Sequence, residues 1–255
     1  FVGELAWLQD ATRTLSATAL SPVHAHYVDA ADFRALLSSY RPSAFHLLME
    51  VMRLVGQRVR HTERTSMELC RGASPARATE AGTSRGATLE PSTFDPRPYL
   101  DAFPLFASLT RGDREELLAR GELTEASRGA GLTGPGRSAT PCWIVLYGAL
   151  EAICPDSRLR MAVLGPGAPI GFLEHLLGED HLMELRVREP AVLLELSPSA
   201  CSALMSPTDR LSYRLLHGLC IASIEALERA NLVLAREQRM HETAQPGISP
   251  PARSA

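Results

Sequence analysis

The chain repeats its own pattern after 168 residues, without gaps. Glycines, prolines and leucines coincide in the two segments: Gly3 with Gly171, Leu5 with Leu173, Leu8 with Leu176, Pro22 with Pro190, and Leu47-Leu48 with Leu215-Leu216. Such self-similarity indicates two copies of one structural module. Because the repeat starts with the first residues of the chain, we expect the first copy to be truncated and to comprise only its C-terminal part.

The first copy opens with a motif suited to a small anion. Gly3-Glu4-Leu5-Ala6-Trp7-Leu8 predicts a short apolar helix behind a glycine, and Arg13 follows. The first amides of a helix have no intrahelical partner, and the helix dipole favours an anion there. A glycine lets a phosphate approach the backbone, and an arginine can contact phosphate oxygens through two parallel donors.

This motif resembles the phosphate-binding cassette of cyclic nucleotide-binding domains, as in catabolite activator proteins and the regulatory subunits of protein kinase A. The resemblance implies that Glu4 accepts a hydrogen bond from the ribose 2′-hydroxyl and that Arg13 contacts the cyclic phosphate. The implied ligand-binding set is Gly3, Glu4, Leu5, Ala6, Arg13, Thr14 and Ser16. Thr12, Leu15 and Ala17 depart from the usual Pro, Ala and Val, and the hydroxyl of Ser16 leaves the choice between cAMP and cGMP open.

The second copy keeps the apolar positions of the cassette and replaces the polar ones. In the same register Glu4 corresponds to Phe172 and Arg13 to His181. A phenylalanine cannot accept a hydrogen bond from a hydroxyl, and a histidine is largely neutral near pH 7. Acidic residues stand where the phosphate would lie: Glu174, Glu179, Asp180 and Glu184. We therefore predict that the second copy is degenerate and does not bind a cyclic nucleotide.

Helix and loop signals divide the chain into four parts. Residues 1–70 would hold the cassette, two short strands within 18–28, a helix capped by Asp29 and running through Leu37, and a long helix from Pro42 to about Met67. Residues 71–96 are rich in Gly, Ser, Thr, Ala and Pro, which predicts a flexible linker. Residues 97–240 form the second, degenerate module, and residues 241–255 a disordered tail.

The second module has the pattern of a small antiparallel β-structure. Thr110 can cap a helix over 113–120, and strand-like runs follow at 122–128, 143–147, 150–154 and 159–164. A long helix from Asp209 to about Arg239 repeats the one after Pro42. Residues 103–110 and 143–151 also resemble segments of cyclic nucleotide-binding domains. The expected fold is mixed β plus α, with antiparallel jelly-roll modules and flanking helices.

Composition narrows the classes of function. The chain has 255 residues, 45% of them hydrophobic, and a net charge of −3, which gives no basic surface for nucleic acid. The sequence contains neither a signal peptide nor an apolar run near the roughly 20 residues that span a bilayer, so we expect a cytoplasmic protein. The five cysteines form no close pair, which predicts buried thiols and no metal site. The sequence indicates no nucleophile–base pair, so we predict no enzymatic activity and no cofactor beyond a cyclic nucleotide ligand.

A structural or protein-interaction module without a ligand is the alternative to a sensor. In that case the long helices would form a homodimer or partner surface through Leu215, Leu216, Leu219, Ile224, Leu227 and Leu232, or these residues would pack within their own module. Residues 242–255 are too few for a helix-turn-helix, so we expect no DNA binding by this chain.

Overall fold

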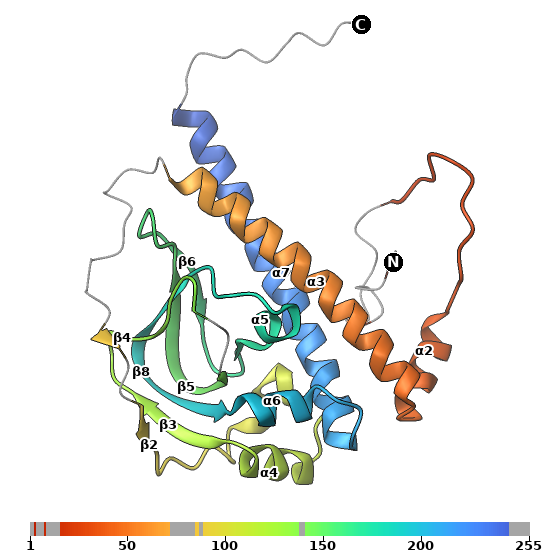
Figure 1. The fold of residues 1–255 in the computed structure, drawn as a ribbon, viewed down its shortest axis with the longest axis horizontal. Coiled ribbons are helices and arrows are strands. Elements are labelled where there is room, and N and C mark those ends of the chain that lie inside the picture. Colours follow the sequence, from red (N-terminus) through yellow and green to blue (C-terminus); the bar gives the residue numbers. More distant parts are fainter. Residues whose placement is uncertain are drawn as a thin grey trace, which may run out of the picture.

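The computed structural model describes Gly3, Leu8 and residues 16–71, 85–86, 89–137 and 141–244. The strands gather in one body, and two long helices lie side by side next to it (Figure 1). The helices are α2 (Ala30–Ser38), α3 (Pro42–Cys70), η2 (Leu100–Ala102), η3 (Pro104–Phe106), α4 (Arg111–Ala119), α5 (Phe172–Leu177), α6 (Pro198–Leu204) and α7 (Arg210–Ala244). The strands are β1 (Arg85–Gly86), β2 (Glu90–Pro91), β3 (Glu122–Ala126), β4 (Ala130–Thr133), β5 (Cys142–Ile153), β6 (Arg160–Leu164), β7 (Pro169–Ile170) and β8 (Glu184–Leu196).

The sheet is built around β5 and β8, which pair antiparallel from one end to the other. β3 and β4 add to β8, and β6 and β7 add to β5, all antiparallel, while the short β1 pairs in parallel with β4. The register between β5 and β8 shifts around Gly148, whose φ is +77°. A Cβ there would lie 2.1 Å from the carbonyl oxygen of Pro190, so this bulge requires a glycine. The predicted antiparallel sheet with flanking helices is confirmed for the second module.

The local signals for the helices are also confirmed. Asp29 caps α2 by accepting a hydrogen bond from the amide of Asp32 at 2.7 Å. Pro42 is the first residue of α3, which extends three residues beyond the predicted end to Cys70. Thr110 and Asp113 form a reciprocal capping box at the start of α4.

The helices of the two predicted copies begin in one register. α2 and α6 start at Ala30 and Pro198, and α3 and α7 start at Pro42 and Arg210, so the members of each pair begin 168 residues apart. The two long helices run in the same direction beside each other (Figure 1).

Within the described residues, no helix combines the length and the apolarity that crossing a membrane requires.

One apolar core joins the two segments that the sequence separates. It lies between the helices and includes Phe45 and Leu48 of α3 together with Leu215, Leu216 and Leu219 of α7, each at most 1% exposed. A second cluster lies within the sheet and includes Leu150, Val187 and Leu193. Residues 30–70 thus pack on the second module rather than standing apart from it.

The apolar residues considered for a dimer surface pack inside the chain. Of the six on α7, five are buried in the core that α7 shares with α3, namely Leu215, Leu216, Leu219, Ile224 and Leu227. Leu232 is 71% exposed. These five residues therefore pack inside the chain, but against α3 of the first segment as well as within their own module.

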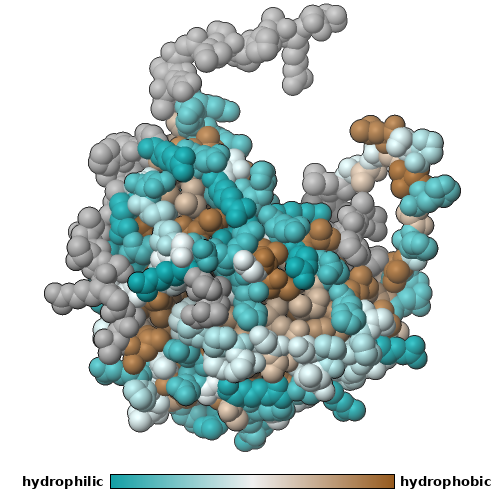
Figure 2. All heavy atoms as spheres, viewed as in Figure 1, coloured by the Kyte–Doolittle hydropathy of each residue, from teal (hydrophilic) through white to brown (hydrophobic). Residues whose placement is uncertain are grey.

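The two strands predicted within residues 18–28 are absent from the structure. Residues 16–29 have no regular secondary structure and extend away from the body, with Leu20 99% and Tyr27 83% exposed (Figures 1 and 2). A strand needs a neighbour to pair its amides and carbonyls. The described part of the chain offers this segment no such neighbour, so its alternating pattern does not produce a strand.

The linker prediction is wrong for two short stretches of residues 71–96. β1 at residues 85–86 pairs with β4, and β2 at residues 90–91 pairs with β3, so the sheet begins before Arg97. Residues 72–84 and 87–88 lie outside the described part of the chain. Both strands add to the edges of the sheet by pairing with residues 33 to 45 positions further along the chain, which a composition rich in glycine and proline does not indicate.

Candidate functional site

The structure describes two of the seven residues predicted to bind a ligand in the first copy. Gly3 has a left-handed backbone with φ +87°, and Ser16 is exposed. Gly171, the counterpart of Gly3, has nearly the same φ of +84°. The other five predicted residues lie outside the described part of the chain, namely Glu4, Leu5, Ala6, Arg13 and Thr14. Their joint role as a ligand site remains a prediction.

The second cassette consists of the turn after β7 and the short helix α5. Gly171 precedes the helix, and a Cβ on it would lie 3.3 Å from the carbonyl oxygen of Pro141. Phe172 is 2% exposed and packs in the helical core. The position that corresponds to Glu4 in the repeat is therefore used for apolar packing in the second cassette.

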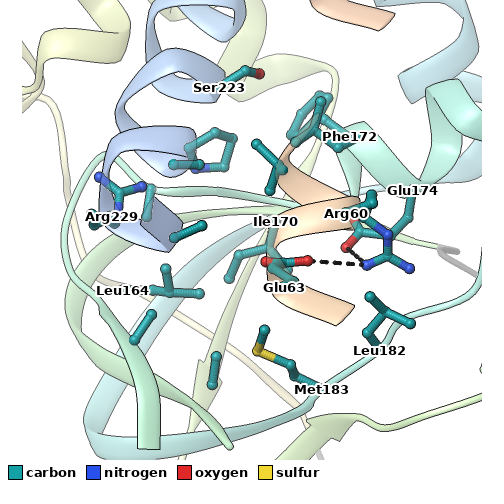
Figure 3. Close-up of a pocket in the computed structure, with 18 of the residues that line it drawn as sticks. Arg60, Glu63, Leu164, Ile170, Phe172, Glu174, Leu182, Met183, Ser223 and Arg229 are labelled. Atoms are coloured by element: carbon teal, nitrogen blue, oxygen red, sulfur yellow. Dashed lines mark hydrogen bonds and ion pairs between the residues drawn. The ribbon is translucent and has the colours of Figure 1, made fainter. Parts of the chain in front are cut away.

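A cavity of about 150 Å³ lies beside this cassette. Figure 3 shows it enclosed by α3, by α7 and by the strands and turns around Ile170. Most of the side chains that line it are apolar, among them Val59, Met161, Leu164, Ile170, Phe172 and Met183. Three charged side chains, Arg60, Glu63 and Glu174, gather at the end where α3 meets α5, whereas Ser223 and Arg229 of α7 lie apart from them (Figure 3).

Arg60 of α3 enters the second cassette and is 4% exposed. Its Nε donates to Glu179 Oε2 at 3.1 Å, its Nη1 donates to Glu174 Oε1 at 3.3 Å, and its Nη2 donates to the carbonyl oxygen of Asp180. Glu63, one turn further along α3, has its Oε2 3.6 Å from Arg60 Nη1. A guanidinium surrounded by two carboxylates and a backbone carbonyl thus occupies the end of the cavity next to α5.

The buried charges shift the protonation of two glutamates in opposite directions. Burial, aided by the negative charge of Glu174, raises the pKa of Glu63 to about 7, against the opposing charges of Arg60 and Arg64. Burial also acts to raise the pKa of Glu174, but the hydrogen bond from His181 and the charges of His181 and Arg60 outweigh it and lower that pKa. His181 has its Nδ1 3.5 Å from Glu174 Oε1, and its buried Nε2 has no hydrogen-bond partner among the described residues.

The replacement Glu63→Gln should change how stability depends on pH. Glu63 binds its proton more tightly in the folded chain than in the unfolded one, so its contribution to the free energy of unfolding falls as pH rises from about 4.5 to about 7. One proton gives a slope of at most about 1.4 kcal/mol per pH unit. The glutamine removes this contribution, which denaturant unfolding at several pH values measures. Identical slopes for wild type and variant would contradict the assignment, and Glu50→Gln on the exposed side of α3 serves as control.

Comparison with known proteins gives structural matches and no sequence matches. No protein-family model and no curated protein matches the chain. Similar solved structures include the c-di-GMP-responsive global regulator CLP of Xanthomonas campestris, with 20% identity over 56% of this chain and 77% of that one and a TM-score of 0.45. The regulatory domain of Toxoplasma gondii protein kinase A with cAMP matches at 22% identity, 42% of each chain and a TM-score of 0.37. The Thermus thermophilus catabolite activator protein matches at 18% identity, 55% of this chain, 61% of that one and a TM-score of 0.36.

These similar structures belong to the kind of protein that the cassette motif resembles. The repeat predicts a role for Phe172, His181 and the acidic residues around them, but nothing in the sequence signals Arg60 and Glu63. On the sequence both stand at the polar end of an amphipathic helix, where charged residues are ordinarily solvated.

Proposed function

We propose that the chain is a non-enzymatic regulatory module in which the first cassette senses cAMP or cGMP and the second cassette holds helix α3. The observation that carries the proposal is the position of Arg60. Its guanidinium is buried among Glu174, Glu179 and the carbonyl of Asp180, so the second cassette binds a cation supplied by the chain itself. This arrangement leaves the first cassette as the site for an anionic ligand.

The connection between the cassettes supports a regulatory role. α3 follows the first cassette in sequence, with only the segment 17–29 and α2 between them, and its middle and end pack on the second. A ligand shifts such an arrangement if it binds one position of the helices better than another. The common register of α2 with α6 and of α3 with α7 supports the view that both halves descend from one module.

A titration of cAMP and of cGMP into the protein, with and without Arg13→Ala, tests the proposal. Loss of a charge-assisted hydrogen bond to the phosphate should weaken binding by about 1.5–3 kcal/mol. Arg34→Ala, which removes an exposed arginine from α2, should leave the affinity unchanged. Calorimetry measures both.

Two results would decide against the sensor. Equal affinity of wild type and Arg13→Ala would remove Arg13 from the site. If neither nucleotide binds to the wild type, the alternative of a ligand-free interaction module replaces the proposal.

A further inference from the structure

Two cysteines that are far apart in sequence meet in the structure. Cys142 is the first residue of β5 and Cys201 lies in α6, and their Sγ atoms are 2.9 Å apart. Both are at most 1% exposed. His175 of α5 completes the group, since a ring nitrogen and the two sulfurs all lie within 4.8 Å of one another.

We propose that Cys142, His175 and Cys201 form a zinc site. Two thiolates and an imidazole are a ligand set that Zn²⁺ prefers, and a zinc site with three protein ligands keeps a fourth position for water or another ligand. At Zn–S distances of about 2.3 Å, two thiolates of a tetrahedral site are roughly 3.8 Å apart. The sulfurs therefore need to separate by less than about 1 Å to admit the ion.

The surroundings of the imidazole favour a ligand role. Ser202 Oγ lies 3.2 Å from His175 Nε2, and a hydroxyl on one ring nitrogen can orient an imidazole whose other nitrogen binds a metal. His175 is half-buried and Ser202 is exposed, which gives an ion access from solvent on this side of the thiols. The group adjoins the second cassette, since His175 follows Glu174 in α5, but it shares no ligand atom with the contacts of Arg60, which involve Glu174 and Glu179.

Zinc binding by the two thiols is a proton exchange. A bound metal displaces the proton from a thiol. Binding follows Zn²⁺ + 2 RSH → Zn(SR)₂ + 2 H⁺, with both protons released to solvent and no change in oxidation state.

Metal loading of the untagged chain under reducing conditions tests the proposal. After incubation with Zn²⁺ and removal of unbound ion, we expect about one zinc per chain, and with Co²⁺ a sulfur-to-metal charge-transfer band. Cys142→Ser and Cys201→Ser should each lose the band and the retained zinc. His175→Gln, at a half-buried position that should not disturb folding, should bind zinc more than about tenfold more weakly.

Cys154→Ala is the matched control, because Cys154 is also fully buried and lies outside the group. It should retain one zinc. Three results would overturn the proposal: no zinc retained and no thiolate band in the wild type, equal zinc content in the wild type and both serine variants, or an isolated protein lighter by two hydrogen atoms with Cys142 linked to Cys201. None of these readouts depends on nucleotide binding by the first cassette.

Discussion

Arg60→Ala is expected to lower the free energy of unfolding by about 3 kcal/mol, because it removes the buried cation of a charge cluster and leaves Glu174 and Glu179 with only His181 and Arg64 as partners. The Arg60 side chain is 4% exposed, and its partners Glu174 and Glu179 are 18% and 32% exposed. Glu63 lies beside the same guanidinium. Removal of one cation therefore affects three acidic side chains at once, and repulsion among them should also weaken the contact between α3 and α5.

Arg64→Ala is the control for this prediction. Arg64 lies on the same helix and donates to the same Glu179 oxygen at 2.7 Å, but its side chain is 51% exposed. Its loss should cost no more than about 1 kcal/mol. Urea unfolding of both variants measures the difference. Arg60→Lys should fall between them, since an ammonium cannot reproduce the divergent contacts of the guanidinium. Equal losses for Arg60→Ala and Arg64→Ala would show that burial of Arg60 has no energetic consequence.

Gly218→Ala is expected to destabilise the chain by about 2–3 kcal/mol, although alanine favours helices. Gly218 lies in α7 where η3 crosses it, and a Cβ would lie 2.3 Å from the carbonyl oxygen of Leu105. That oxygen belongs to the backbone and cannot rotate away as a side chain could. The clash would separate η3 from α7, and with it the core contacts of Leu105 and Phe106.

Gly112→Ala provides the matched comparison for Gly218. Gly112 is an exposed helical glycine in α4, and a Cβ there meets only Thr110 Oγ1 at 3.9 Å. The same substitution should stabilise α4 by about 0.5–1 kcal/mol. The melting temperature and the free energy of unfolding should therefore fall for Gly218→Ala and rise for Gly112→Ala. A Gly218→Ala protein as stable as the wild type would mean that η3 does not approach α7 as closely as the structure places it.

Features with a local physical cause could be predicted from the sequence. The caps at Asp29 and Thr110 and the proline at the start of α3 act within one helical turn, so a few residues determine them. The degeneracy predicted for the second cassette rests on Phe172 and His181, which the repeat identified by position. The sequence pattern predicts two strands, 143–147 and 150–154, where the structure has the single strand β5. Gly148 lies between the two predicted runs, and a glycine in a strand pattern can signal either a turn or a bulge.

Contacts between distant segments could not be predicted in this way. β8, the strand at the centre of the sheet, was not anticipated at all, since its Arg-Glu-Pro at 188–190 interrupts the apolar pattern. Arg60 meets Glu179 across 119 positions of sequence, and Cys142 meets Cys201 across 59. Periodicity and spacing describe neighbours along the chain, whereas these pairs depend on how helices and strands pack in three dimensions.

The glycine at the centre of α3 has a mechanical consequence. Gly56 is equally far from Pro42 and Cys70, and its missing side chain lets α5 approach so closely that a Cβ would lie 3.0 Å from Leu173 Cδ2. A helix of 29 residues therefore rests on α5 at its midpoint, with two arms of about 20 Å each. Because α3 also packs along α7, a displacement of one arm would be passed to α7 as well as to α5. Beyond the far arm, Arg71 contacts Asp156 in the turn between β5 and β6, so the same helix also reaches the end of the sheet.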